Sequence, residues 1–146
     1  MVLGHDQYGR LLNRIVKCCG DIDFEERVKN KSHYDFRSWP ELFLFGDIYV
    51  LDFGFADCEF DLWWLLRRKQ QEGCGDGKVY YYGHDPADAA GTHQLLVEAH
   101  GVEMILNRFS DGQKDSYCVF YEEVMKEIRD RIQCRRADIE SSDAPI

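Results

Sequence analysis

The sequence lacks several features that would assign it to a common functional class. No apolar run approaches the roughly 18–20 residues that a membrane-spanning helix needs. Positive charge is also scarce, since 18 lysines and arginines stand against 27 aspartates and glutamates. The resulting net charge of -9 repels nucleic acid and anionic membranes. We therefore predict that this protein binds neither nucleic acid nor a membrane.

Metal and disulfide motifs are missing as well. No cysteine pair has C-x-x-C spacing, and the only close pair is the vicinal Cys18-Cys19, which falls within a helical pattern. The N-terminus does not resemble a signal peptide, because polar residues follow after only a few positions. We predict a cytoplasmic protein whose reduced thiols pack as small apolar groups. The six cysteines are Cys18, Cys19, Cys58, Cys74, Cys118 and Cys134.

The stretch from Asp47 to Lys69 is the part around which the rest of the chain is expected to pack. It opens with Ile48-Tyr49-Val50-Leu51, a short run that suits a strand buried on both faces. A tight turn follows at residues 52–56, and then a helix that is acidic at its start and basic at its end. The middle of this helix, Leu62-Trp63-Trp64-Leu65-Leu66, is apolar on several faces, so we expect it to be covered on more than one side, with Phe60 also buried.

The remaining segments alternate between strand and helix. Strands are predicted at residues 47–52, 78–82 and 102–106, and helices at residues 5–19, 23–28, 41–45, 57–69, 92–100 and 115–134. Alternation of this kind indicates a parallel sheet with right-handed crossovers. The predicted fold is α/β, a three-layer, half-Rossmann fragment behind an N-terminal helical segment. We expect one domain over residues 1–134 and a disordered tail over residues 135–146.

The organising stretch resembles a known family. The run I-Y-V-L-x-F-G-F, followed by E-F-D-L-W-W-L-L-R-R-K, is similar to the C-terminal half of bacterial sirtuin-like NAD-binding domains. The similarity covers most of residues 3–130, and its distinctive part is D-L-W-W-L-L. The residues themselves require no cofactor, but the resemblance implies NAD. Complete domains of this family are deacylases or NAD hydrolases.

The resemblance also implies which residues would contact the nucleotide. The turn Asp52-Phe53-Gly54-Phe55 would face the nicotinamide ribose, and the end of the second strand, from Tyr82 to His84, would lie near the adenine ribose. Family members carry a glycine where this chain has Asp52. A carboxylate about 4 Å from a phosphate costs on the order of 4 kcal/mol at an effective dielectric constant of 20.

The first half of the family domain supplies a glycine-rich phosphate loop and the catalytic histidine, and both would lie before Met1. No G-x-G-x-x-G occurs in the sequence. We therefore expect a sirtuin-like half-domain that is non-enzymatic by itself, with at most residual binding of NAD or ADP-ribose.

Two other hypotheses concern partners. The net charge suits a small acidic interaction protein, of the inhibitor or immunity type, that binds a basic protein. A half-Rossmann sheet also leaves its first strand exposed, and exposed sheet edges tend to pair with another chain. We therefore expect that a second copy or another protein covers this edge.

Overall fold

A computed structural model of the chain describes residues 5–29, 36–51, 53, 55, 59–73, 77–84, 92–107 and 116–142. Three strands form one parallel sheet in the order β1-β2-β3. They are β1 (Ile48–Leu51), β2 (Val79–His84) and β3 (Val102–Asn107). This confirms the predicted α/β fold with three parallel strands and flanking helices. Strand β2 continues to His84, past its predicted end at residue 82, because Gly83 and His84 pair with Leu106 and Asn107 of β3.

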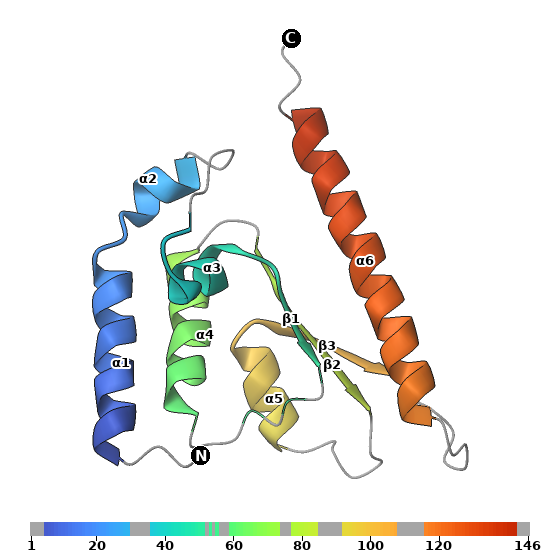
Figure 1. Ribbon diagram of the computed structural model, residues 1–146, viewed down its shortest axis with the longest axis horizontal. Coiled ribbons are helices and arrows are strands. Elements are labelled where there is room, and N and C mark those ends of the chain that lie inside the picture. The colour runs from blue at the N-terminus through green and yellow to red at the C-terminus, as the bar shows by residue number, and fades with distance from the viewer. Residues whose placement is uncertain are drawn as a thin grey trace.

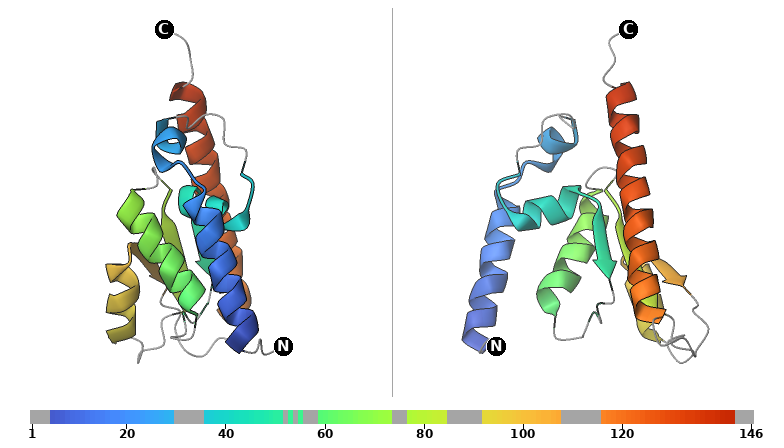
Figure 2. Two further views of the ribbon diagram at one scale, coloured as in Figure 1. Left: turned by 90° about the vertical axis from the view of Figure 1, so that its left-hand side faces the viewer. Right: turned by 45° about the vertical axis from the view of Figure 1, so that its right-hand side comes forward.

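The helices cover both faces of the sheet (Figures 1 and 2). Helices α4 (Phe60–Glu72) and α5 (Thr92–Ala99) lie on one face, and α6 (Ser116–Ser142) lies on the other. Helix α1 (His5–Gly20) packs on the outer side of α4, together with α3 (Trp39–Phe45). The short helix α2 (Phe24–Lys29) follows α1 in the chain and lies near its C-terminal end. One face of the sheet thus carries two layers of helices and the other face carries one.

The side chains of β2 alternate between the two faces, as the pleat of a strand requires. Val79 belongs to a buried cluster with Leu66 of α4 and Val97 of α5. Tyr82 belongs to a second cluster, on the opposite face, with Phe120 of α6. Each face of the sheet thus has its own core.

The double-tryptophan helix α4 is covered on two sides, as predicted. Leu65 packs with α1 and α3, and Trp64 lies against the same cluster. Leu66 and Trp63 pack with the sheet cluster instead. The expected burial of Phe60 is wrong, because this side chain is 61% exposed. At about 100° per residue, Phe60 points away from the buried side of the helix that carries Leu65 and Leu66.

Lys69 has a role that its place in the sequence does not reveal. In the sequence it is one of the basic residues at the C-terminal end of its own helix, α4. Its buried ammonium instead donates hydrogen bonds to three carbonyl oxygens at the end of α3, those of Phe43 (3.1 Å), Leu44 (2.7 Å) and Gly46 (2.8 Å). A cation at this position satisfies carbonyls that a helix end leaves without intrahelical partners.

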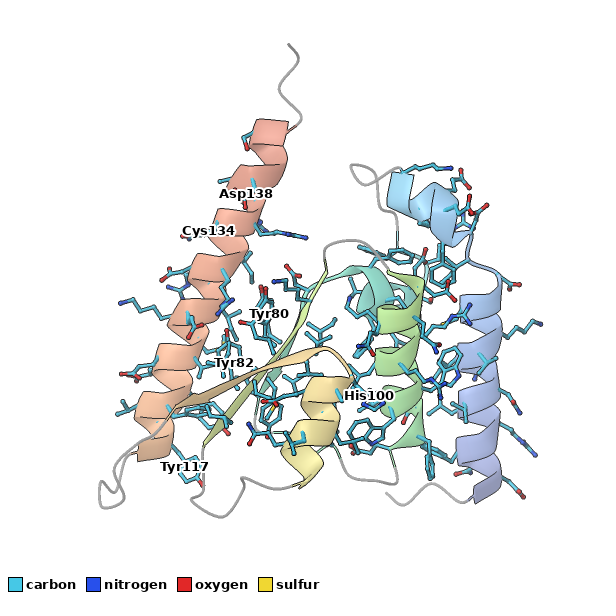
Figure 3. The ribbon with its side chains drawn as sticks, turned by 180° about the vertical axis from the view of Figure 1, so that it is seen from behind. Tyr80, Tyr82, His100, Tyr117, Cys134 and Asp138 are labelled. Carbon is cyan, nitrogen blue, oxygen red and sulfur yellow. The ribbon has the colours of Figure 1, made fainter. Side chains whose placement is uncertain are left out.

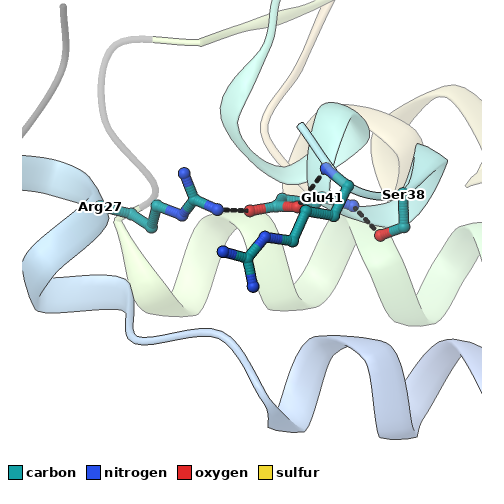
Figure 4. Close-up of polar contacts among 4 residues, drawn as sticks. Arg27, Ser38 and Glu41 are labelled. Carbon is teal, nitrogen blue, oxygen red and sulfur yellow. Dashed lines mark hydrogen bonds and ion pairs between the residues drawn. The ribbon is translucent and has the colours of Figure 1, made fainter. Parts of the chain in front are cut away.

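The start of α3 is held by a buried carboxylate (Figure 4). The Ser38 hydroxyl accepts a hydrogen bond from the Glu41 N–H at 3.5 Å. The Glu41 carboxylate accepts one from the Arg37 N–H at 2.9 Å and forms an ion pair with Arg27 at 2.6 Å. Because Arg27 belongs to α2 and Glu41 to α3, this ion pair connects α2 to α3.

Helix α6 is longer than its apolar pattern predicts. It runs to Ser142, past the expected end at residue 134 and into the segment expected to be a disordered tail. Its C-terminal end projects beyond the sheet in Figure 1. None of the described helices is both long and apolar enough to cross a membrane.

Candidate functional site

The carboxyl ends of the three strands lie along one end of the sheet. Ligands bind at this end in open α/β folds, and we call it the candidate edge. Leu51 of β1 pairs with Tyr82 of β2, and Tyr82 pairs with Ile105 of β3. The turn after β1 therefore starts beside the end of β2, so the structure brings the two predicted halves of the site to the same edge. Asp52 and Gly54 lie outside the described residues. His84 ends β2, and its side chain also lies outside them.

Phe55 anchors the turn after β1. Its φ angle is 45°, in the left-handed region that a bulky residue adopts only when its surroundings hold it there. The buried ring lies 5.8 Å from both Trp63 and Tyr81, and 5.3 Å from Phe53 in an edge-on arrangement. Phe55 thus acts as a core residue, packed between the sheet and α4. Of the two predicted site residues Phe53 and Phe55, Phe53 is the one that is partly exposed to solvent.

Tyr82 faces the core. Its side chain is 0% exposed, and its hydroxyl donates to a Glu127 carboxylate oxygen of α6 at 3.3 Å. Figure 3 shows the ring pointing from the sheet toward α6. The predicted contact of this residue with an adenine ribose is therefore not supported for the side chain, because its position in the pleat directs it to the face that α6 covers.

Tyrosine and arginine side chains form a cluster beside the hydrophobic core between the sheet and α6, and no motif in the sequence indicated it. The rings of Tyr49 and Tyr80 are stacked with their centroids 5.3 Å apart. The Arg131 guanidinium lies 4.6 Å from the Tyr80 ring centroid and forms an ion pair with Glu127 at 2.9 Å. The Glu127–Arg131 ion pair lies within α6, whereas the cation–π contact with Tyr80 and the Tyr82–Glu127 hydrogen bond join α6 to the sheet.

Burial shifts the acidity of this cluster. Burial, and then the nearby Glu127 carboxylate, raise the pKa of Tyr82 to about 12. Burial, and then Asp47, raise the pKa of Tyr49 above its ordinary value. Both hydroxyls therefore stay protonated across the physiological range, and neither is suited to act as a general base there.

The raised pKa of Tyr82 predicts a loss of stability at high pH. Its ordinary pKa is 10.0 and its folded pKa is about 12, so the unfolded chain loses this proton first as the pH rises. The free energy of unfolding should therefore be unaffected by this group below pH 10 and should fall between pH 10 and pH 12. Urea titrations of the wild type and of Tyr82→Phe across this range measure it. The wild type should lose more stability than Tyr82→Phe, and equal losses would contradict the assignment.

The N-terminus of α4, which follows the candidate turn, is already occupied. The Tyr8 hydroxyl of α1 accepts a hydrogen bond from the Asp61 N–H at 3.0 Å and donates one to the Asp61 carboxylate. The N–H groups of Leu62 and Trp63 are directed to the Glu59 carbonyl. A carboxylate in the first turn already neutralises the positive end of the helix dipole. This helix end is therefore unsuited to a phosphate.

Gly83 is a tightly packed residue at the candidate edge. A Cβ placed there would lie 2.6 Å from the Tyr81 ring and 3.3 Å from a Leu106 methyl group. Its missing side chain is explained by packing against these two neighbours, so this glycine by itself does not indicate a ligand.

The described cysteines are free thiols, and they divide into two kinds. Cys19 is buried as predicted, and burial, followed by its neighbour Cys18, raises its pKa to about 11. The predicted packing is wrong for Cys18, Cys118 and Cys134, which are exposed because they lie on the outer sides of their helices. Within the described ranges, no cluster of three or more histidine, cysteine or acidic residues could hold a metal ion.

The fold and the candidate edge together define a small α/β protein with a three-stranded parallel sheet. No family model, curated protein or solved structure matches the chain.

Proposed function

We propose that this chain is a sirtuin-like half-domain that binds NAD or ADP-ribose weakly at the carboxyl edge of its sheet and does not catalyse a reaction by itself. The observation that carries the proposal is the parallel pairing of Leu51 with Tyr82, which starts the F-G-F turn beside the end of β2. In open α/β sheets this edge is the usual place for a nucleotide. The left-handed Phe55 adds support, because backbone strain is concentrated at functional turns.

Three properties argue that such binding is weak. The sequence has no glycine-rich phosphate loop. The start of α4 carries Asp61 and is capped by the Tyr8 hydroxyl, so a pyrophosphate gains little there. Asp52 adds a further carboxylate directly after β1. The nucleoside, rather than the phosphates, would supply most of the affinity.

A titration with NAD and with ADP-ribose tests this proposal. Calorimetry should give a Kd in the millimolar range for the wild type, which corresponds to a binding free energy of about 4 kcal/mol. Asp52→Gly should tighten binding by about tenfold or more, because it removes the carboxylate that follows β1 in the sequence and that would repel a nearby phosphate. Asp52→Asn separates the loss of charge from the gain of backbone freedom.

Asp138→Asn is the matched control, since it removes the same charge from the exposed end of α6, far from the candidate edge (Figure 3). It should leave the affinity unchanged. If neither the wild type nor Asp52→Gly binds at millimolar nucleotide, the nucleotide site is refuted. Release of nicotinamide by the isolated chain would refute the non-enzymatic part of the proposal.

A second candidate function rests on charge. With a net charge of -9, the protein would attract a basic partner by electrostatic steering. We propose this acidic interaction protein as the alternative. Binding to a basic protein that weakens steeply as salt is added, with no response to NAD, would favour it over nucleotide binding.

A further inference from the structure

Among the described residues, strand β1 is paired on one side of its backbone only. It is an edge strand, and within the described part of the chain only β2 pairs with it. The Ile48 N–H donates to the Lys78 carbonyl at 2.8 Å, so Ile48 and Val50 direct their backbone groups toward β2. By alternation, Tyr49 and Leu51 direct their N–H and C=O groups outward. This outer edge can accept another strand.

The side of α6 above this edge is apolar and exposed. On the side of α6 that faces β2, Glu127 contacts Tyr82 and Arg131 contacts Tyr80. Around the helix from Arg131, in the direction of β1, comes Arg135, which reaches Asp47 just before β1. Further around in the same direction, by roughly 40–80° at 100° per residue, come three apolar side chains that we call the α6 flank. They are Tyr121 (40% exposed), Met125 (54%) and Ile132 (38%).

We propose that a second copy of this chain covers both features at once. A two-fold axis perpendicular to the sheet, beside β1 and midway between the two copies of this strand, would pair the outward groups of Tyr49 with those of Leu51 in the other copy, as an antiparallel ladder. The two sheets would then be continuous, and the two α6 flanks would face each other above the joined edges. Helix α6 packs mainly over β1 and β2, since its cluster contacts Tyr49, Leu51, Tyr80 and Tyr82 but only Ile105 of β3. This position brings the two helices within packing distance.

The partner is a second copy of the chain because, in this arrangement, acidic residues of one α6 would meet basic residues of the other α6. Glu127 lies at the level of the Tyr82–Leu51 pair, and Arg131 at the level of the Tyr80–Tyr49 pair. Val50 lies midway between Tyr49 and Leu51, and Arg129 lies midway between Glu127 and Arg131. A two-fold axis at the level of Val50 is therefore also at the level of Arg129 on α6.

Glu122 and Arg136 lie seven residues before and seven residues after Arg129, on the same side of the helix. In the antiparallel pair each Glu122 would meet the Arg136 of the other copy, which gives two equivalent ion pairs. Arg129 would approach its own copy at the axis, and this like-charge contact, with the short four-residue strand, keeps the dimer weak and concentration-dependent.

Sedimentation velocity over a range of concentrations tests the proposal. The wild type should shift from monomer to dimer as concentration rises, and Met125→Glu should remain monomeric. Glu122→Arg and Arg136→Glu should each weaken the dimer by about tenfold or more, because like charges then meet. The double variant Glu122→Arg/Arg136→Glu should restore it. Glu123→Arg makes the same charge change on the other side of the helix and should have no effect.

Hydrogen exchange tests the strand pairing separately. The amides of Tyr49 and Leu51 should exchange slowly at concentrations where the dimer forms and rapidly in Met125→Glu. A wild type that stays monomeric at high concentration would overturn the proposal, as would a double variant that fails to restore the dimer. A dimer in which these two amides exchange rapidly would overturn the strand pairing. None of these measurements involves nucleotide, so their outcome is independent of the proposed function.

Discussion

Replacing Leu65 with alanine should lower the free energy of unfolding by about 2–5 kcal/mol. Leu65 is 0% exposed and lies where α4 meets α1 and α3, in a cluster with Ile15, Cys19 and Leu44. Truncation removes apolar surface from a close-packed site and leaves a cavity, and the two terms add. A chemical denaturation series with a two-state fit measures the loss as a lower midpoint with an unchanged slope.

Leu95→Ala is the matched control for this prediction. Leu95 lies on α5 and is 68% exposed, so the same truncation should change stability by no more than about 0.5 kcal/mol. A loss at Leu65 no larger than at Leu95 would show that α1 and α3 do not pack on α4 as described. The comparison therefore tests the outer helical layer, which is the part of the fold farthest from the sheet.

Replacing Lys69 with methionine should lower the free energy of unfolding by about 2–4 kcal/mol. Methionine keeps much of the apolar stem but removes the ammonium that bonds to the carbonyls of Phe43, Leu44 and Gly46. These acceptors would then be desolvated without a donor, and the last turn of α3 would lose its cation. Hydrogen exchange should show that the amides of α3 lose protection before those of β2.

Arg67→Met removes a neighbouring cation from the exposed side of α4 and serves as the control. It should leave stability within about 0.5 kcal/mol of the wild type. Equal effects at the two positions would mean that the loss comes from general charge and not from the end of α3. Lys69→Arg adds a second comparison, because it keeps the charge but replaces a compact ammonium with a planar guanidinium.

The fold was readable from the sequence because its signals are local. Short runs rich in β-branched and other apolar residues at Ile48–Leu51 and Val102–Leu106 marked two of the strands, and both were confirmed. The alternation of strands with helices then indicated parallel pairing, since such crossovers leave few other arrangements. The end of β2 was missed because Gly83 reads as a turn residue, whereas pairing with Leu106 keeps it in the strand.

Only part of the candidate site could be predicted from the sequence. The meeting of the β1 turn with the end of β2 follows from parallel order alone. The direction of Tyr82 does not, because Tyr80-Tyr81-Tyr82 has no alternation of apolar and polar residues to show which side faces α6. Only the packed structure directs Tyr80 and Tyr82 to α6 and Tyr81 to the opposite face.

The sequence by itself determined the order of strands and helices, the central place of the double-tryptophan helix, and the net charge of -9. Tertiary structure decided which carbonyls Lys69 satisfies, which tyrosine faces α6, and which side of α6 stays open beside the edge of β1. The physical reason is range. Periodicity and propensity act between residues a few positions apart, whereas these contacts join residues brought together only when the layers pack.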